Sequence, residues 1–270
     1  MTAVPTPAES RFVERPDGVR LYVEVHGGGP GGPLVLLEGL GGDIPGWRRS
    51  LPHLSERRPV IAYDFRGNGR SDKPDRPMTM ETLVEDTLAV LDAMAVDRAH
   101  VYGQSLGGMV AIELVLTHPA RVRSLVLGAT HAGRARASRV RPDLRKAPKG
   151  KPFLALYGAD FAQANPDHVA EDLLVGSRNP QPPHARARQG DAVAAWDAWD
   201  RLGGIRVPTL ILHGTQDRLV AVANGRRLDS LIPDARLVLL KGTGHVYHSE
   251  RAEDADRAVL SFLDEVEAGR

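Results

Sequence analysis

The chain has 270 residues, which is enough to bury one sizeable core, and its 35 basic and 34 acidic residues leave a formal net charge of +1. A balance this close to neutral does not favour nucleic acid or an anionic membrane surface as a partner, and the absence of cysteine excludes disulfides, thiolate catalysis and cysteine-ligated metals. No apolar run has the length of a signal peptide core near the N-terminus or of a membrane span elsewhere, so we expect a cytoplasmic protein.

The N-terminal part predicts an antiparallel hairpin. Residues 11–15 and 19–25 alternate apolar and polar side chains, and the turn Pro16-Asp17-Gly18 separates them. The glycine-rich segment 27–32 has some likeness to a phosphate-binding loop, but it joins two strands, opens no helix and contains no lysine. We therefore interpret it as a turn.

Six short runs predict strands of a parallel sheet, namely residues 33–37, 59–63, 99–102, 123–127, 208–213 and 236–240. The run at 33–37 is apolar throughout, which is typical of a strand buried on both faces. Helical spacing is found over residues 79–95, from residue 106 to about 118, and over residues 253–267. Strands that alternate with helices favour an α/β fold with a doubly wound, mostly parallel sheet, in which chemistry gathers at the carboxyl ends of the strands.

The alternation is interrupted between residues 131 and 205. Three helical segments, at about 152–164, 166–176 and 184–202, occur here without a buried strand. We expect residues 131–205 to form a helical lid, inserted between two parts of the core at residues 1–130 and 206–270. Within this insertion, residues 134–151 carry eight basic side chains and one acid. A solvated loop is the simpler interpretation, and an acidic substrate or an acidic carrier domain is the alternative.

The motif Gly103-Gln104-Ser105-Leu106-Gly107 stands between the run at 99–102 and the following helix. A strand that turns at once into a helix forces its apex residue to a positive φ, and only small residues fit beside the apex. The turn exposes the hydroxyl of Ser105 and places the N–H of Leu106 at the start of the helix, where negative charge is stabilised. The motif therefore predicts a serine nucleophile.

A serine nucleophile needs a base, and the base needs an acid that orients it. Asp217 follows the run at 208–213 and is our candidate for the acid, while His245 follows the run at 236–240 and is our candidate for the base. All three residues thus lie at carboxyl ends of predicted parallel strands. We therefore predict that Ser105, Asp217 and His245 form a catalytic triad.

Two other histidines compete for roles in this site. His248 is an alternative base, but Gly242 and Gly244 would let the loop of His245 approach the sheet edge closely, which favours His245. His213 lies at a strand end before the acid loop, and we assign it a structural role.

With these motifs the chain resembles the α/β-hydrolase fold family, and within it the lid-bearing esterases, enol-lactonases and perhydrolases. The resemblance covers about residues 11–130 and 206–268. It rests on Gly39-Leu40-Gly41, Asp64-x-Arg66-Gly67-x-Gly69-x-Ser71, Gly103-Gln104-Ser105-Leu106-Gly107-Gly108, His213-Gly214-x-x-Asp217 and Gly244-His245. The resemblance implies that the backbone N–H groups of Leu40 and Leu106 form the oxyanion hole and that the Arg66 loop is scaffold. It also implies a small-molecule acyl substrate, with neither a metal nor a cofactor.

Glu38 departs from the family pattern, which usually places histidine before the glycine of the oxyanion loop. An ionised carboxylate facing the oxyanion would oppose the charge that forms there. We therefore expect Glu38 to line or back the pocket, to point away from the oxyanion, and to accept hydrogen bonds from backbone N–H groups or a cationic neighbour.

Trp196 and Trp199 are three residues apart on a predicted helix of the insertion. They are candidates to line the substrate pocket. Burial as packing residues is the simpler interpretation for both.

The function predicted from these residues is cleavage of a carboxylic ester, lactone or thioester through an acyl-enzyme on Ser105. One alternative is a cofactor-free perhydrolase or haloperoxidase-like reaction on the same triad, which an assay of peroxide-dependent halogenation would distinguish. A second alternative is a ligand-binding member of the fold without catalysis, which a fluorophosphonate probe would not label. The sequence does not indicate an oligomeric state.

Overall fold

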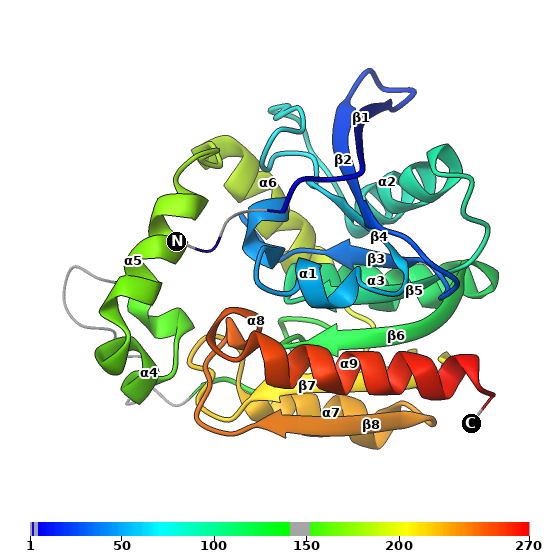
Figure 1. The fold of residues 1–270 in the computed structure, drawn as a ribbon. Helices are drawn as coiled ribbons and strands as arrows, with labels where there is room; N and C mark the ends of the chain where they lie inside the picture. Colours follow the sequence, from blue (N-terminus) through cyan, green and yellow to red (C-terminus); the bar gives the residue numbers. More distant parts are fainter. Residues whose placement is uncertain (1, 3–4, 141–151, 270) are drawn as a thin grey trace.

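The computed structural model describes residues 2, 5–140 and 152–269, and an eight-stranded sheet runs through its centre (Figure 1). The strand order is β1-β2-β4-β3-β5-β6-β7-β8. The strands are β1 (Glu9–Glu14), β2 (Arg20–Gly27), β3 (Leu34–Leu37), β4 (Pro59–Tyr63), β5 (Ala99–Gln104), β6 (Val122–Gly128), β7 (Thr209–Gly214) and β8 (Ala235–Leu240).

Among the described strands, β2 alone runs against the direction of the others. β1 pairs antiparallel with β2, and β2 pairs antiparallel with β4. All pairs from β4 through β3 to β8 are parallel. The doubly wound, mostly parallel α/β sheet that the apolar runs predict is confirmed.

The sheet is covered on both faces. The main helices of the core are α1 (Leu51–Leu54), α2 (Met80–Ala93), α3 (Leu106–Thr117), α7 (Val222–Leu231), α8 (Tyr247–Glu250) and α9 (Ala252–Glu267), with short 3-10 turns at η1 (Ile44–Trp47) and η2 (Pro119–Arg121). Side chains of α2, α3 and α7 share one buried cluster with the sheet, and side chains of α1 and α9 share the other.

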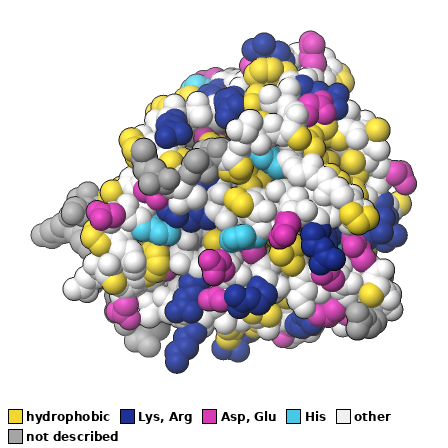
Figure 2. Space-filling model, viewed as in Figure 1, with side chains coloured by type: hydrophobic (Ala, Val, Ile, Leu, Met, Phe, Trp, Pro, Cys, Tyr) yellow, Lys and Arg dark blue, Asp and Glu magenta, His cyan; other side chains and the backbone are white. Residues whose placement is uncertain are grey.

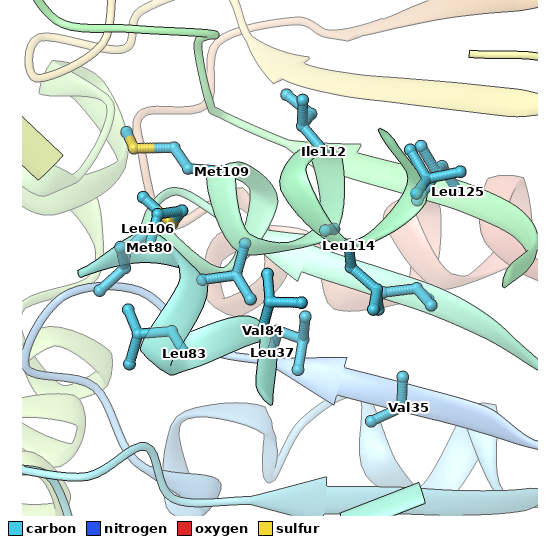
Figure 3. Close-up of a cluster of buried hydrophobic side chains, with 14 of the residues drawn as sticks. Val35, Leu37, Met80, Leu83, Val84, Leu106, Met109, Ile112, Leu114 and Leu125 are labelled. Carbon is cyan, nitrogen blue, oxygen red and sulfur yellow. The ribbon is translucent and has the colours of Figure 1, made fainter. Parts of the chain in front are cut away.

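Strand β3 shows how the two clusters are divided. Leu34 and Leu36 pack into the cluster under α1 and α9, while Val35 and Leu37 pack into the cluster under α2 and α3. Figure 3 shows Leu37 beside Val84 of α2, with Leu114 of α3 nearby. Since successive residues of a strand face opposite sides, a run buried on both faces must be apolar throughout. This explains why the central strands read as continuous apolar segments.

The inserted segment lies between β6 and β7 and contains η3 (Pro152–Leu156), α4 (Ala159–Ala164), α5 (Pro166–Gly176), α6 (Pro183–Ala195) and η4 (Leu202–Gly204). In Figure 1, α4 and α5 lie beyond the carboxyl ends of the parallel strands. The predicted helix at 152–164 is divided into η3 and α4. Of the predicted basic run at 134–151, residues 141–151 lie outside the described residues.

The predicted helix at 184–202 is wrong in its second half. α6 ends at Ala195, and the chain then forms an isolated antiparallel bridge between Asp197 and Gly133. The N–H of Ala198 donates to the carbonyl oxygen of Ala132, with an N···O distance of 2.7 Å. Backbone pairing with a distant segment thus replaces the helical hydrogen bonds.

The helix α7, between β7 and β8, is absent from the sequence prediction. Few of its side chains are apolar, and Leu228 is its one fully buried apolar residue. A helix with so narrow an apolar stripe gives a weak periodic signal.

Positive and negative side chains intermingle over the face shown in Figure 2, in keeping with the near-neutral net charge. Within the described part of the chain, no helix is both long and apolar enough to cross a membrane.

Candidate active site

Ser105 stands at the sharp turn between β5 and α3, with φ 53° and ψ −112°. A Cβ added to Gly103 would overlap the carbonyl oxygen of Gly107, and one added to Gly107 would overlap the carbonyl oxygen of Leu37. The two glycines therefore permit the close backbone approach that the turn needs. The N–H of Ser105 donates to the carbonyl oxygen of Gly128 on β6 (2.8 Å), which ties the apex to the sheet.

Asp217 lies in the loop that follows β7, and its buried carboxylate is held by three donors. Its Oδ1 accepts the backbone N–H groups of Leu219 and Val220, each at 2.8 Å, and its Oδ2 accepts Nδ1 of His245 at 2.8 Å. Burial raises the pKa of Asp217, but the charge of His245 and the hydrogen bonds of His213 and His245 outweigh it and hold the pKa well below its usual range. The carboxylate is therefore ionised at neutral pH.

His245 lies in the loop after β8 and points its Nδ1 at Asp217. Because a carboxylate only accepts, Nδ1 carries the proton, which leaves Nε2 of the neutral ring as an acceptor. Burial lowers the pKa of His245, but the charges of Asp217 and Glu38 and the hydrogen bond to Asp217 raise it above the ordinary value of 6.5 overall. The ring thus has the tautomer and basicity that a general base requires.

The backbone of His245 is fixed from two sides. Its N–H donates to the carbonyl oxygen of Leu156 in the inserted segment (2.6 Å), and its carbonyl oxygen accepts Nε2 of Gln104 from the serine turn (2.8 Å). Glu250 holds the same loop, since its carboxylate accepts the N–H groups of Gly244 (2.7 Å) and Gly158 (3.1 Å). The inserted segment therefore helps to place the base.

His248 differs from His245 in each of these respects. Its ring packs against Trp47, with ring centroids 5.0 Å apart, and its Nδ1 has no hydrogen-bond partner among the described residues. Burial lowers the pKa of His248 to about 4, and the charge of His245 acts in the same direction. It lines a neighbouring cavity and is not among the residues that line the cavity of Ser105. The geometry therefore favours His245 over His248 as the base.

His213 is a third buried histidine near the acid. Its Nε2 lies 3.0 Å from the carbonyl oxygen of Val220 and 3.4 Å from Oδ2 of Asp217. Since the carbonyl can only accept, Nε2 is the protonated nitrogen, and the ring braces the acid loop.

Ser105 and His245 line one cavity of about 880 Å³. Leu40 and Leu106 line it too, and Leu106 is the first residue of α3, so its N–H has no acceptor within the helix. A Cβ added to Gly39 would lie 3.4 Å from Cβ of Ser105, which places the peptide before Leu40 beside the serine. Both predicted oxyanion donors thus belong to backbone next to Ser105.

The carboxyl of Glu38 lies against the next turn of the same loop. A Cβ added to Gly42 would lie 2.9 Å from its Oε1, and one added to Gly46 would lie 3.5 Å from its Oε2. Burial raises the pKa of Glu38 to about 7, the N–H of Gly39 lowers it, and the carboxyl of Asp43 raises it further. Of the two kinds of partner that we expected, the backbone N–H is present at Gly39, while Oε2 has no hydrogen-bond partner among the described residues.

Trp196 and Trp199 do not line the cavity, and their assignment to a substrate pocket is corrected. The indole N–H of Trp196 donates to the carboxylate of Glu113 (2.7 Å), and that of Trp199 donates to the carbonyl oxygen of Gly133 (2.9 Å). Both rings belong to the buried cluster beneath α3. Because α6 ends at Ala195, the helical spacing that suggested a shared face does not apply to them.

The Arg66 loop has the structural role that the resemblance implies. The guanidinium of Arg66 is buried and makes two hydrogen bonds of 2.6 Å to the carboxylate of Asp86. Asn68 of the same loop donates to the carbonyl oxygen of Gly42 (2.7 Å) and accepts Nε2 of Gln189 on α6 (3.0 Å). The loop thus links the predicted oxyanion loop to the inserted segment.

The structure adds residues that sequence reasoning missed. His131 and Arg186 line the cavity, as do Arg134 and Arg139 of the basic run. His131 follows the end of β6 as closely as Asp217 follows β7, and this position at a strand end is the signal that could have found it. Burial lowers its pKa to about 4, so the ring is neutral at neutral pH. Among the described residues, no group of three or more His, Asp or Glu side chains is arranged to hold a metal ion.

Comparison with known proteins gives consistent matches along the chain. A family model described as "alpha/beta hydrolase fold" matches residues 32–252. The RutD protein of Variovorax paradoxus, provisionally named a carbamate hydrolase, is 35% identical over 260 residues, which cover 92% of this chain and 97% of RutD.

Two solved structures are similar in both sequence and fold. A hydrolase from Pseudomonas aeruginosa is 30% identical, with a TM-score of 0.83 over 96% of this chain and 99% of that protein. The enol-lactonase from Burkholderia xenovorans is 30% identical, with a TM-score of 0.78 over 92% of this chain and 98% of the enol-lactonase.

Proposed function

Because the chain belongs to the α/β-hydrolase fold family, we propose that it is a serine hydrolase that cleaves a carboxylic ester, lactone or thioester through an acyl-enzyme on Ser105. One observation carries the proposal. Nδ1 of His245 donates to the buried carboxylate of Asp217 at 2.8 Å, while the ring and Ser105 line the same cavity. This arrangement supplies a nucleophile, a base with a free Nε2 and an acid that orients the base.

In the first step, Oγ of Ser105 attacks the substrate carbonyl carbon and its proton passes to Nε2 of His245. The carbonyl oxygen takes the negative charge, and the N–H groups of Leu40 and Leu106 stabilise it. Asp217 remains ionised, because its pKa is held well below its usual range, and so stabilises the imidazolium that forms.

The second step breaks the bond between the carbonyl carbon and the leaving oxygen or sulfur, which takes the proton from Nε2 of His245. A water molecule then attacks the ester on Ser105 and gives its proton to His245. The bond to Oγ breaks, Ser105 recovers the proton, and the carboxylic acid is released.

We extend the proposal to the inserted segment, which acts in it as a lid that selects the substrate. Cavity-lining residues from the segment, among them Leu156 and Val193, face the catalytic candidates. Loops and insertions over a rigid sheet edge are where specificity is commonly carried.

A carbamate is the second candidate substrate. It is favoured by the similarity to RutD, which extends over nearly the whole of both chains. Attack of Ser105 on a carbamate carbonyl would use the same base and the same oxyanion donors, with an amine or alcohol as the leaving group.

A substrate screen of the wild-type protein and Ser105→Ala tests the proposal. The panel holds p-nitrophenyl esters, lactones, acyl thioesters and aryl carbamates, with peroxide-dependent halogenation as a separate arm. We expect hydrolysis of at least one acyl class by the wild type and its loss in Ser105→Ala, with unchanged circular dichroism. Hydrolysis that survives in Ser105→Ala, or halogenation without hydrolysis, would contradict a serine hydrolase.

A further inference from the structure

Among the described residues, the arginines that line the cavity lack the ion pairs that a nearby arginine in the sequence forms with carboxylates. In residues 134–139, Arg136 does not line the cavity, and it forms ion pairs with Asp197 and with Asp200, the latter at 2.9 Å. Arg134 and Arg139 line the cavity, and their side chains have no ion pair or hydrogen bond with any described residue.

The same division occurs on α6. Arg188 lies outside the cavity and contacts Oδ1 of Asp75 through two nitrogens, at 3.0 and 3.1 Å. Arg186, two residues earlier, lines the cavity, and its side chain has no ion pair or hydrogen bond with the described residues. A Cβ added to Gly41 would lie 3.1 Å from Nη1 of Arg186, so the guanidinium lies beside the predicted oxyanion loop.

Arg134, Arg139 and Arg186, which we call the cavity arginines, therefore bring to one cavity three positive charges that have no partner among the described residues. Glu38 is the one carboxyl among the described lining residues, and it lies against Gly42 and Gly46. Its raised pKa reduces the negative charge that it contributes at neutral pH. Like charges gathered without partners favour the binding of an anion between them.

We propose that this cavity selects acyl substrates whose non-reacting end carries a carboxylate, which the cavity arginines bind while the carbonyl carbon lies at Ser105. A guanidinium presents paired N–H donors that match a carboxylate in two-point contact. The inference rests on the proposed function for its chemistry, but the recognition of the carboxylate can be measured without turnover.

The test compares p-nitrophenyl hexanoate with mono-p-nitrophenyl adipate, which share chain length and leaving group and differ by a terminal carboxylate. We expect kcat/KM of the wild type to be about tenfold higher for the adipate ester, the ratio that corresponds to about 1.4 kcal/mol. Because the cavity arginines are exposed, the preference should fall as salt rises, while hydrolysis of the hexanoate ester should not.

Replacement of the cavity arginines one at a time, and then together, shows which of them cause the higher kcat/KM for the adipate ester. Arg186→Gln, Arg134→Gln and Arg139→Gln should each reduce the ratio of kcat/KM for the adipate ester to kcat/KM for the hexanoate ester, and the triple variant should bring this ratio to about one. Arg188→Gln is the matched control on α6, and Arg136→Gln is the matched control in the other segment. Both controls remove the same charge outside the cavity and should keep the preference.

Binding to Ser105→Ala separates this inference from the proposed function. By calorimetry, that variant should bind mono-p-nitrophenyl adipate more tightly than the hexanoate ester, and added Arg186→Gln should reduce the difference. If no ester is hydrolysed but this binding difference is found, the proposed function fails and the inference stands. Equal binding of both esters, or a preference that Arg188→Gln reduces as much as Arg186→Gln, would overturn the inference.

Inorganic phosphate is a second anion whose negative charge suits the cavity arginines. At constant ionic strength, adipate should inhibit hydrolysis of the hexanoate ester more strongly than inorganic phosphate does. Stronger inhibition by phosphate would overturn the assignment to a carboxylate.

Discussion

At the carboxyl edge of the sheet, Ser105, Asp217 and His245 stand on backbone that is buried and tied by hydrogen bonds to neighbouring strands and loops. Across the cavity, the inserted segment presents exposed side chains such as Arg134 and Arg186, which have no partner among the described residues. We propose that this fixed edge supplies the precision that proton transfer needs, while the inserted segment on the opposite wall selects the substrate. Under this proposal, chemistry and selectivity lie in different regions of the molecule.

Replacement of His245 and of His248, three residues apart, tests the fixed edge and should have the largest effect on kcat. His245→Ala should reduce kcat by several orders of magnitude, because the base is lost, whereas His248→Ala should cost far less. Steady-state kinetics on one p-nitrophenyl ester, with melting temperatures of both variants, measure the difference. The reverse ranking would show that the base has been misassigned.

Asp217→Asn should lower kcat by about a thousandfold or more while the protein still folds, because the amide cannot stabilise the imidazolium. The pH profile gives a second readout. His245 must be neutral to accept a proton, so activity is lost as pH falls through its pKa, which Asp217 raises above 6.5. In Asp217→Asn this acidic limb should therefore move to lower pH. An unmoved limb at near-normal rate would point to a different acid.

Glu38 lines both the cavity of Ser105 and the neighbouring cavity of His248, and Glu38→Gln should keep most of the activity. Its folded pKa of about 7 lies above the ordinary value of 4.5, so ionisation destabilises the folded state as pH rises between the two values. The melting temperature of Glu38→Gln relative to the wild type should therefore increase from about pH 4.5 to about pH 8.

Glu38→Ala should cost more activity than Glu38→Gln, because it removes the side chain that packs against Gly42 and Gly46. If Glu38→Gln abolishes turnover without loss of stability, the carboxyl takes part in the reaction and simple ester hydrolysis is the wrong description.

Val193→Phe changes the opposite wall of the cavity and should have the smallest effect on activity. Val193 lies on α6 and lines the cavity, so a larger side chain there should shift preference toward shorter acyl chains by a few-fold in kcat/KM. A series of p-nitrophenyl esters of increasing length measures the shift. An unchanged profile in a folded variant would remove this part of the segment from substrate selection.

The sheet and the positions of the triad candidates were predictable from the sequence, because each signal is local. A strand buried on both faces must be apolar throughout, as β3 is, and the turn at Ser105 needs glycine at Gly103 and Gly107 for steric reasons within a few residues. Parallel strands then bring their carboxyl ends to one edge, which places Asp217 and His245 near Ser105 without any knowledge of contacts.

The opposite wall depends on contacts between segments far apart in the chain. The bridge between Gly133 and Asp197 ends the helical run before Trp196, and the local sequence pattern does not predict this bridge. Likewise, the sequence shows an excess of arginine but does not show that Arg136 finds carboxylates while Arg134 does not. These features depend on the tertiary arrangement that the insertion adopts.

Covalent labelling of the wild-type protein with a fluorophosphonate tests the central claim most directly. A nucleophile activated by His245 and oriented by Asp217 should react at one site, and peptide mapping by mass spectrometry should place the adduct on Ser105, with parallel loss of ester hydrolysis. Ser105→Ala should carry no adduct. An adduct on another residue, or full hydrolysis with Ser105 unlabelled, would contradict the assignment of Ser105 as the nucleophile.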